Sequence, residues 1–380
     1  MSGLPRFVML YAAMYAAYGV ASPFLPAFVN SRGIAPAELG LVLGTGTAVR
    51  LVSAPLAGRI GDLLEALRTV LVLCIALAAL ATLGYLRAEY FWTFLAVSAL
   101  QAAALAPMTV LADALALGAA KREQFEYGWV RGTGSAAFIV GTLASGQAVA
   151  AAGLGVIVAL QAALLGVAAA AALFVPDLPH PRAAHAERES VMTLFRLPVF
   201  RYVVLIAALV LGSHAMHDAF AMIRWRAAGI GPTTGSVLWS EAVLAEVVVF
   251  FLIGPALVRR LTPPGALALA ALAGIVRWSV MATSTGVAVL ALVQPLHGIT
   301  FALLHLACMR LIAQAVPPSL AGTAQAIYGT VGIGGATALV TLSSGALYGR
   351  LGGAAFWVMA LLCAGAVPLA WRLARSSDLH

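Results

Sequence analysis

Apolar residues recur along the chain in stretches of roughly 20, separated by short polar turns. At about 1.5 Å of rise per residue, a helix of this length crosses the ~30 Å hydrocarbon core of a bilayer. Only helices and closed barrels satisfy every backbone group in lipid, and the stretches lack the alternation that a barrel needs. We therefore predict twelve membrane-spanning helices, at residues 7–29, 39–60, 67–86, 92–116, 128–150, 154–175, 200–222, 236–257, 265–283, 287–313, 321–345 and 354–373.

The longest polar interruption is "PDLPHPRAAHAERES" at residues 176–190, which divides these spans into six and six. We expect an N-terminal six-helix bundle at residues 1–176, a cytoplasmic linker at 177–199 and a C-terminal six-helix bundle at 200–380. The predicted fold is therefore all-α and integral to the membrane, with twelve helices in two pseudo-symmetric bundles.

Short matches suggest that the two halves arose by duplication. "TLASG" (142–146) in the fifth span recurs as "TLSSG" (341–345) in the eleventh, and residues 41–50 align with 237–246. Duplicated six-helix halves are typical of transporters whose solute site lies near the membrane midplane at the repeat interface. Several glycines in the fifth and eleventh spans let neighbouring helices approach closely, which serves either packing or gating.

The amino-acid composition indicates the cellular compartment. Hydrophobic residues make up 62% of the 380 residues and charged residues 9%, far below the roughly 25% charged residues of a soluble domain. The net charge of +8 fits arginine-rich cytoplasmic loops facing anionic headgroups, so we expect no nucleic-acid partner and both termini in the cytoplasm. Heavy alanine use and arginine in place of lysine suggest a bacterial plasma (inner) membrane. The three cysteines have no paired spacing, so we expect no disulfide, metal or cofactor.

Ionisable side chains inside the spans are the candidate chemistry, because they normally face partners or a water-filled cavity. Asp113 and Arg131 are each nine residues from Arg122 in the turn between the fourth and fifth spans. An antiparallel hairpin then places them at equal depth, where an acid and a base can pair. Arg277 and His297 are likewise each ten residues from Val287. Each pair either locks its hairpin or serves function.

The remaining intramembrane groups are assigned by position. Glu246 aligns with Arg50 of the first half, which places one charge in each repeat. His214, His217 and Asp218 share one helix face at spacing i, i+3, i+4, and we interpret them as an outer gate or proton relay rather than a metal site. His305 is either a relay residue or a packing histidine.

At "PLAGRIGD" (55–62), followed by Arg68, the chain resembles the cytoplasmic loop of the major facilitator superfamily. The usual basic residue after the aspartate is replaced by Leu63. By this resemblance Asp62 latches neighbouring helices, and with Arg50 and Arg68 it belongs to the gating residues.

Within that superfamily the chain is similar to the phenylpropionate permease-like group, which is related to lactose permease. The similar stretches are "RWSVMATS" (277–284), "LVQPLHGITFALLHLACM" (292–309), "PPSLAGTAQAIYGTVGIG" (317–334) and "FEYGWVRG" (125–132). The resemblance implies that Arg131 and Asp113 hold the solute, that Phe138 stacks on it, and that Arg277 and His297 belong to a proton-coupling network. We also expect Arg277 and His297 to be among the solute-binding residues.

The proton-carrying glutamate of lactose permease corresponds to Thr300 here, and its lysine partner to Gln294. The carrier must therefore be reassigned. We place Glu246 first, because a carboxyl in a dry cavity beside a movable arginine can take up and release a proton. Asp113 and His297 follow.

Together these observations predict a proton-coupled symporter that imports a small organic solute by alternating access, with an aromatic or other organic acid as the solute. The alternatives are a sugar or nucleoside symporter, or an efflux antiporter for amphipathic compounds. An enzyme is not expected, since no catalytic motif lies in a loop, and a channel is not expected, because the charges are unique and opposed in sign. The expected partners are the solute, protons and the lipid bilayer, and the expected state is a monomer.

Overall fold

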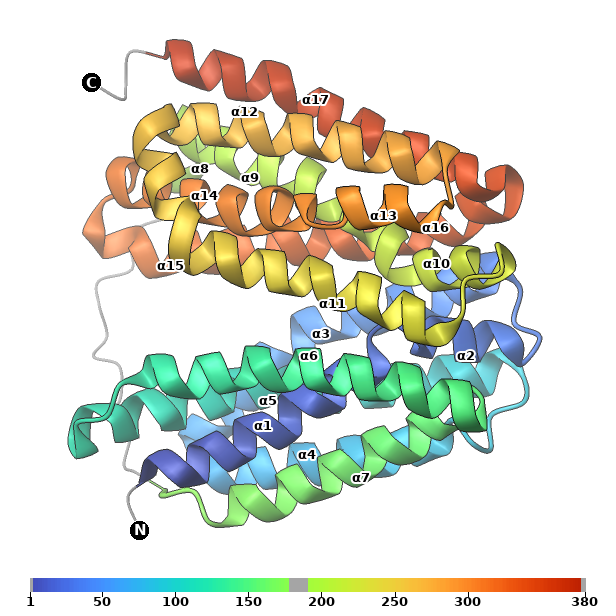
Figure 1. Cartoon of the computed structure of the whole chain (residues 1–380). Coiled ribbons are helices and arrows are strands. Elements are labelled where there is room, and N and C mark those ends of the chain that lie inside the picture. The colour runs from blue at the N-terminus through green and yellow to red at the C-terminus, as the bar shows by residue number, and fades with distance from the viewer. Residues whose placement is uncertain (1–2, 178–190, 377–380) are drawn as a thin grey trace. The chain divides into compact units, whose positions relative to one another are not determined.

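The computed structural model describes residues 3–177 and 191–376, and every regular element within these ranges is a helix (Figure 1). This confirms the all-α membrane fold. The chain divides into two compact units: Met1–Arg182 with Trp225–Ser240, and Ala183–Arg224 with Glu241–His380.

The first unit contains seven helices before residue 177. They are α1 (Gly3–Ala21), α2 (Leu25–Ser31), α3 (Pro36–Leu64), α4 (Leu67–Gly84), α5 (Phe91–Glu123), α6 (Tyr127–Ala152) and α7 (Val156–Leu173). Proline occupies the first turn of α2 and of α3, where its missing N–H would have no intrahelical partner in any case. Left-handed residues Glu65 and Gln124 end α3 and α5 and turn the chain back into the next helix.

The second unit is also helical but less regular. Its elements, two of which are shared with the first unit, are α8 (Met192–Arg196), α9 (Pro198–Gly212), α10 (His214–Ala227), α11 (Pro232–Val248), η1 (Val249–Ile253), α12 (Gly254–Thr283), α13 (Val287–Val293), η2 (Gly298–Leu303), α14 (Leu304–Ala315), η3 (Pro318–Leu320), α15 (Ala321–Ile327), η4 (Tyr328–Gly335), α16 (Ala336–Leu351), η5 (Gly352–Ala355) and α17 (Phe356–Arg375). Three of these, η1, η2 and η4, are π-helical. Such wide turns are rare and occur often at functional sites.

The expected spans can be compared with these helices. By length and composition, nine helices in the described ranges could cross a membrane, or ten if α1 and α2, which are bent by 41°, form one span. Two of the nine are continuous segments of 52 and 58 residues, Pro232–Thr283 and Pro318–Arg375. Each is long enough for two crossings, since one takes roughly 20 residues. Each of the twelve expected spans lies mostly on helical residues, with short breaks such as residues 22–24 in the first span and Ser213 in the seventh.

Local breaks divide the two long segments where the sequence predicted turns. Thr262 has φ 61° and ψ 159° and is followed by Pro263 and Pro264, which lack backbone donors. Gly352, with φ 54°, separates α16 from α17. Most of the expected linker, residues 178–190, lies outside the described residues, and its final part forms α8 and the start of α9.

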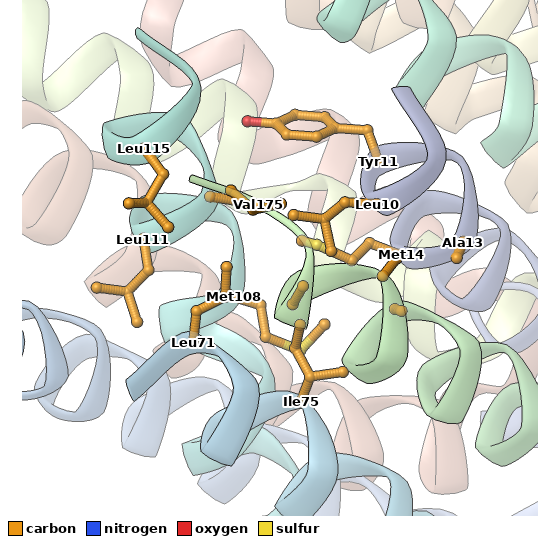
Figure 2. Packing of buried hydrophobic residues seen from close by; sticks show 14 of the residues in the cluster. Leu10, Tyr11, Ala13, Met14, Leu71, Ile75, Met108, Leu111, Leu115 and Val175 are labelled. Atoms are coloured by element: carbon orange, nitrogen blue, oxygen red, sulfur yellow. The ribbon is translucent and has the colours of Figure 1, made fainter. Parts of the chain in front are cut away.

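A buried apolar cluster holds the first unit together (Figure 2). Leu10 and Met14 of α1, Ile75 of α4, Met108 of α5 and Leu165 of α7 are all fully buried within it. Because lipid is as apolar as these side chains, the cluster stabilises the unit mainly through close packing. The faces left exposed also carry large apolar residues, as expected for a surface in contact with lipid.

Glycine permits a close helix contact in this unit, between α1 and α6. A Cβ at Gly141 would lie 2.5 Å from the carbonyl oxygen of Ala16 and 3.0 Å from its Cα. The hydroxyl of Thr142 donates to the carbonyl of Gly19 at 3.0 Å across the same contact. By contrast, a Cβ at Gly132 would meet no atom within 4 Å. Of the two roles expected for these glycines, packing explains Gly141.

We predict that Gly141→Ala destabilises the protein while Gly132→Ala does not. The methyl group at 141 must push backbone apart, which costs about 1–3 kcal/mol, whereas alanine at 132 adds helix propensity without a clash. Thermal unfolding of the detergent-solubilised variants measures the difference. Equal melting temperatures for the two variants would contradict close α1–α6 packing.

Candidate functional site

Asp113 on α5 and Arg131 on α6 meet across the turn that joins their helices, as the residue count predicts. Arg131 Nη1 lies 3.9 Å from Asp113 Oδ1. Both side chains are partly exposed, at 39% for Arg131 and 31% for Asp113. The contact is single and long, so it is an ion pair without the two short hydrogen bonds of a bidentate pair.

Tyrosines take the hydrogen bonds that this pair does not make. Tyr127 donates to Asp113 Oδ1 at 2.7 Å, and Tyr11 donates to the same oxygen. Arg131 donates to the hydroxyl of Tyr15, and its guanidinium carbon lies 5.3 Å from the centre of that ring. The acid and the base are thus each held by phenol groups while remaining within reach of each other.

Three tyrosines line up along α1 beside this pair. The rings of Tyr11 and Tyr15 are stacked with centroids 5.8 Å apart, and those of Tyr15 and Tyr18 meet edge to face at 5.7 Å. Their spacing, i, i+4 and i+7, places them on one helix face. Phe138, the expected stacking residue, lies two turns after Arg131 on α6 and is partly buried.

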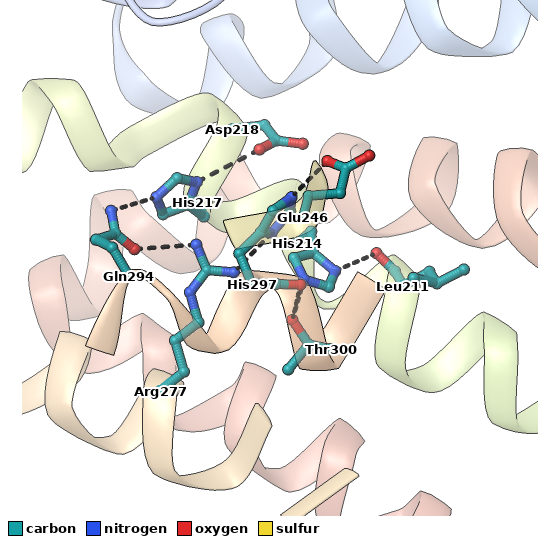
Figure 3. A network of polar contacts seen from close by, with 9 residues as sticks. All are labelled: Leu211, His214, His217, Asp218, Glu246, Arg277, Gln294, His297 and Thr300. Carbon is teal, nitrogen blue, oxygen red and sulfur yellow. Dashed lines mark hydrogen bonds and ion pairs between the residues drawn. The ribbon is translucent and has the colours of Figure 1, made fainter. Parts of the chain in front are cut away.

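A second polar group occupies the second unit and is centred on Arg277 of α12 (Figure 3). This side chain is fully buried. Its guanidinium contacts His297 Nδ1 and donates to Gln294 Oε1, both at 3.0 Å, and its carbon lies 4.6 Å from the centre of the Trp278 ring. No carboxylate of the described chain lies within ion-pair distance of it.

The bonding to Arg277 sets the tautomer of His297. Arginine has only donors, so Nδ1 of His297 must accept and the ring proton of the neutral imidazole is on Nε2. That atom lies 3.4 Å from Oε2 of Glu246 on α11. The expected Arg277–His297 contact is therefore present, and it directs a histidine N–H toward the carboxylate singled out from the sequence.

A second series of hydrogen bonds begins on the other side of the guanidinium. Since Gln294 accepts from Arg277 through its oxygen, its amide nitrogen donates to His217 Nε2, 3.2 Å away. The proton of His217 is then on Nδ1, 3.4 Å from Asp218 Oδ1. One buried cation thus orients two neutral histidines, each with its N–H toward a carboxylate.

His214 belongs to the same region but not to these two chains. Its Nδ1 lies 3.2 Å from the carbonyl of Leu211 and its Nε2 lies 2.9 Å from the hydroxyl of Thr300. Thr300 thus has a structural partner here, although it cannot carry a proton as a glutamate would. His214, His217 and Asp218 therefore do not form one hydrogen-bonded set. His214 bonds to Leu211 and Thr300, whereas His217 bonds to Gln294 and Asp218.

Two other expected residues, His305 and Arg50, lie outside the hydrogen-bonded sets described above. His305 on α14 binds the hydroxyl of Tyr328 at 3.1 Å and stacks on Phe250. Arg50 on α3 is exposed. Their expected roles in relay and gating stay predictions.

Near the loop at 55–68, Arg68 makes polar contacts, while the expected latch role of Asp62 stays a prediction. Arg68 Nε lies 3.7 Å from Asp177 Oδ2, and its Nη1 donates to the carbonyl of Val175 at 3.3 Å. The Asp62 side chain is exposed and has no hydrogen bond or ion pair with any described residue. Within the first unit, Arg68 therefore ties the start of α4 to the end of α7.

Sequence reasoning missed the phenol partners Tyr11, Tyr15 and Tyr127 and the bridging role of Gln294. The spacing of the α1 tyrosines was a usable signal, because three phenols on one face of an apolar helix need partners. Gln294 gave no such signal. Three or more potential metal ligands do not gather anywhere in the described ranges.

Apolar helices of membrane-spanning length, with opposed charges inside them, define a helical integral membrane protein. The chain belongs to the MFS_1 like family, whose sequence profile matches residues 4–359. It is 35% identical over 368 residues to the "Probable 3-phenylpropionic acid transporter" of Escherichia coli (strain K12), covering 94% of this chain and 95% of that one. It is 24% identical over 345 residues to the maltose permease of Geobacillus stearothermophilus, covering 90% and 87%.

Solved structures agree with this fold. The crystal structure of the nucleoside transporter NupG superposes with a TM-score of 0.81 at 16% identity and covers 98% of both chains. An inward-facing bacterial homolog of the human lysosomal transporter Spinster gives a TM-score of 0.74 at 15% identity, covering 99% of this chain and 97% of that one. The predicted resemblance to the major facilitator superfamily is confirmed, and the chain is a transporter and not an enzyme.

We predict that Gln294→Leu destabilises the protein by about 1–3 kcal/mol, because it removes an acceptor from a buried guanidinium and a donor from His217. Thermal unfolding in detergent measures the loss. The matched control is Gln325→Leu, at an exposed position of α15. A Gln294→Leu protein as stable as this control would show that the bridge contributes nothing.

Proposed function

We propose that this transporter imports a small aromatic or other organic acid together with protons. The observation that carries the solute assignment is the state of Arg131, which is 39% exposed, donates to the neutral hydroxyl of Tyr15 and has Asp113 only at 3.9 Å. A guanidinium has five donors, so Arg131 retains N–H groups for a solute carboxylate. Its planar fork suits the two oxygens of such a group.

The surroundings of Arg131 suit an aromatic ring attached to that carboxylate. Tyr15 and Tyr18 are partly exposed beside it, and Phe138 follows on α6. Aromatic pairs add roughly 0.5–1.5 kcal/mol beyond the burial of their area. The name of the Escherichia coli relative, a probable 3-phenylpropionic acid transporter, supports the same solute class.

A sugar or nucleoside is the second candidate, and one observation favours it. The Asp113 carboxylate and the tyrosine hydroxyls could bind solute hydroxyl groups, and a relative is named maltose permease. The organic acid is preferred because only an acid has a carboxylate that can pair with the incompletely paired guanidinium of Arg131. Efflux of amphipathic compounds is the third candidate, and the same site would serve it.

Proton coupling is assigned to the chains around Arg277. Glu246 and Asp218 are 31% and 62% exposed, so water can reach both, while the cation that orients their histidine partners is buried. Protonating a carboxylate changes the charge balance around an unpaired buried cation, which can bias the protein between two conformations. Glu246 remains our first candidate for the proton carrier.

The wider setting follows from the expected topology. We propose a bacterial inner-membrane protein with both termini in the cytoplasm that works as a monomer by alternating access. The excess of arginine in the expected cytoplasmic loops supports this orientation.

We predict that Arg131→Gln weakens binding of 3-phenylpropionate by roughly 10- to 100-fold, the value of a charge-assisted hydrogen bond. Titration of the purified protein with this acid, followed by thermal shift, measures the change. Arg350→Gln, at an exposed end of α16, is the matched control. Stabilisation of the unmodified protein by maltose or nucleosides, with no response to the acid, would reject the solute assignment in favour of the second candidate.

We predict that Glu246→Gln abolishes accumulation driven by a proton gradient while counterflow of labelled solute continues. The amide can still accept a hydrogen bond from His297 but cannot take up a proton. Glu241→Gln, five residues earlier on α11, is the matched control and should retain accumulation. Both are measured in proteoliposomes. Full accumulation by Glu246→Gln would show that Glu246 does not carry the proton and would leave Asp113 and Asp218 as the candidates.

A further inference from the structure

The second unit contains a basic pocket that takes no part in the polar groups described above. Its volume is about 410 Å³, and it lies between α12 and α14, which pack against each other. Its polar lining consists of Arg259 and Thr262 from α12 and of Arg310 and Gln314 from α14, and its apolar walls include Val258 and Leu306. A pocket with two arginines on apolar walls suits a ligand that is anionic at one end and apolar at the other.

Neither arginine is neutralised by the protein. Arg259 and Arg310 are exposed, and in the described ranges neither has a carboxylate within 4.0 Å or a side-chain hydrogen bond. Elsewhere in this chain, partly exposed arginines do find anions, as Arg68 does with Asp177. Two unpaired guanidinium groups on one pocket therefore leave a local excess of positive charge.

The pocket lies at the polar ends of two apolar spans. α14 ends at Ala315, and α12 is broken at Thr262 by the two prolines that follow. In the expected topology both ends face the cytoplasm, where the leaflet carries anionic lipids. Basic pockets between helices on that side bind lipid headgroups.

An exposed apolar surface leads to the arginines along the same helical segment. Leu252 in η1 is 72% exposed and precedes the lining residue Pro255 by three positions and Arg259 by seven. Its neighbour Phe251 is 60% exposed. The acyl chain of a lipid could lie along this surface while the headgroup of the same lipid occupies the pocket. A free inorganic anion would not need such an apolar surface.

We propose that this pocket binds the phosphate of an anionic phospholipid between Arg259 and Arg310, with Gln314 and Thr262 as additional hydrogen-bonding groups and an acyl chain against Leu252. The site is independent of the proposed solute and of proton coupling, because it shares no residue with them. Bound lipid would hold α12 and α14 together at their polar ends.

The test is native mass spectrometry of the purified full chain with phosphatidylglycerol and, separately, phosphatidylcholine of the same acyl chains. The unmodified protein should retain phosphatidylglycerol preferentially. The double variant Arg259→Gln, Arg310→Gln should bind it roughly 30-fold more weakly, about fivefold for each arginine near the surface. The matched control Arg201→Gln, Arg260→Gln removes two exposed arginines that do not line the pocket and should leave binding unchanged.

Three further outcomes decide the proposal. An equal loss in the control variant overturns it, because the lipid would then respond only to net charge. Inorganic phosphate that displaces phosphatidylglycerol at millimolar concentration overturns the lipid assignment in favour of a free oxyanion. Gln314→Glu, which places a carboxylate one helical turn from Arg310, should lower phosphatidylglycerol binding without removing either arginine, and unchanged binding by this variant also overturns the proposal.

Discussion

Lipid offers a polar group no hydrogen-bonding partner, and both the backbone and the intramembrane side chains of this protein follow from that constraint. The backbone satisfies it by forming helices throughout the described ranges. Arg277 meets it only in part, since its Nε has no hydrogen-bond partner among the described residues. The side chain is fully buried, and its charge is met by two neutral acceptors and the face of Trp278. The positions of Gln294 and His297, and through them the orientation of the histidine protons, depend on holding this one cation.

The two arginines of the polar groups illustrate two ways to keep a charge inside a membrane protein. Arg277 is buried and bound on both sides, so it organises its neighbours and remains in place. Arg131 is partly exposed and bound to a phenol, with an acid at 3.9 Å that is itself held by two tyrosines. An arginine in the second situation can exchange partners at modest cost, because its acid keeps the hydrogen bonds of two tyrosines. This difference in exposure is the basis for assigning the solute to Arg131 and the proton to the network around Arg277.

Irregular helices are concentrated where the second unit carries its polar groups. The π-helical segment η2 begins directly after His297 and contains Thr300, and η1 begins at Val249, three positions after Glu246. A wide turn changes which side chains share a face, so residues that a regular helix would separate can meet. It also explains why helix-wheel reasoning is less reliable here than in the first unit.

The amino-acid sequence by itself determined the membrane class, the helical fold, the approximate positions of the helices and the contacts within single hairpins. Asp113 with Arg131 and Arg277 with His297 could be paired by counting residues from a turn, because an antiparallel hairpin fixes depth by chain length alone. Only the tertiary structure decided which partners bridge helices that are distant in sequence: Tyr11 with Asp113, Gln294 with His217, and Glu246 with His297. Those contacts depend on the rotation and packing of whole helices. Helix packing is set by many small contacts, such as Gly141 against Ala16, that no local pattern records.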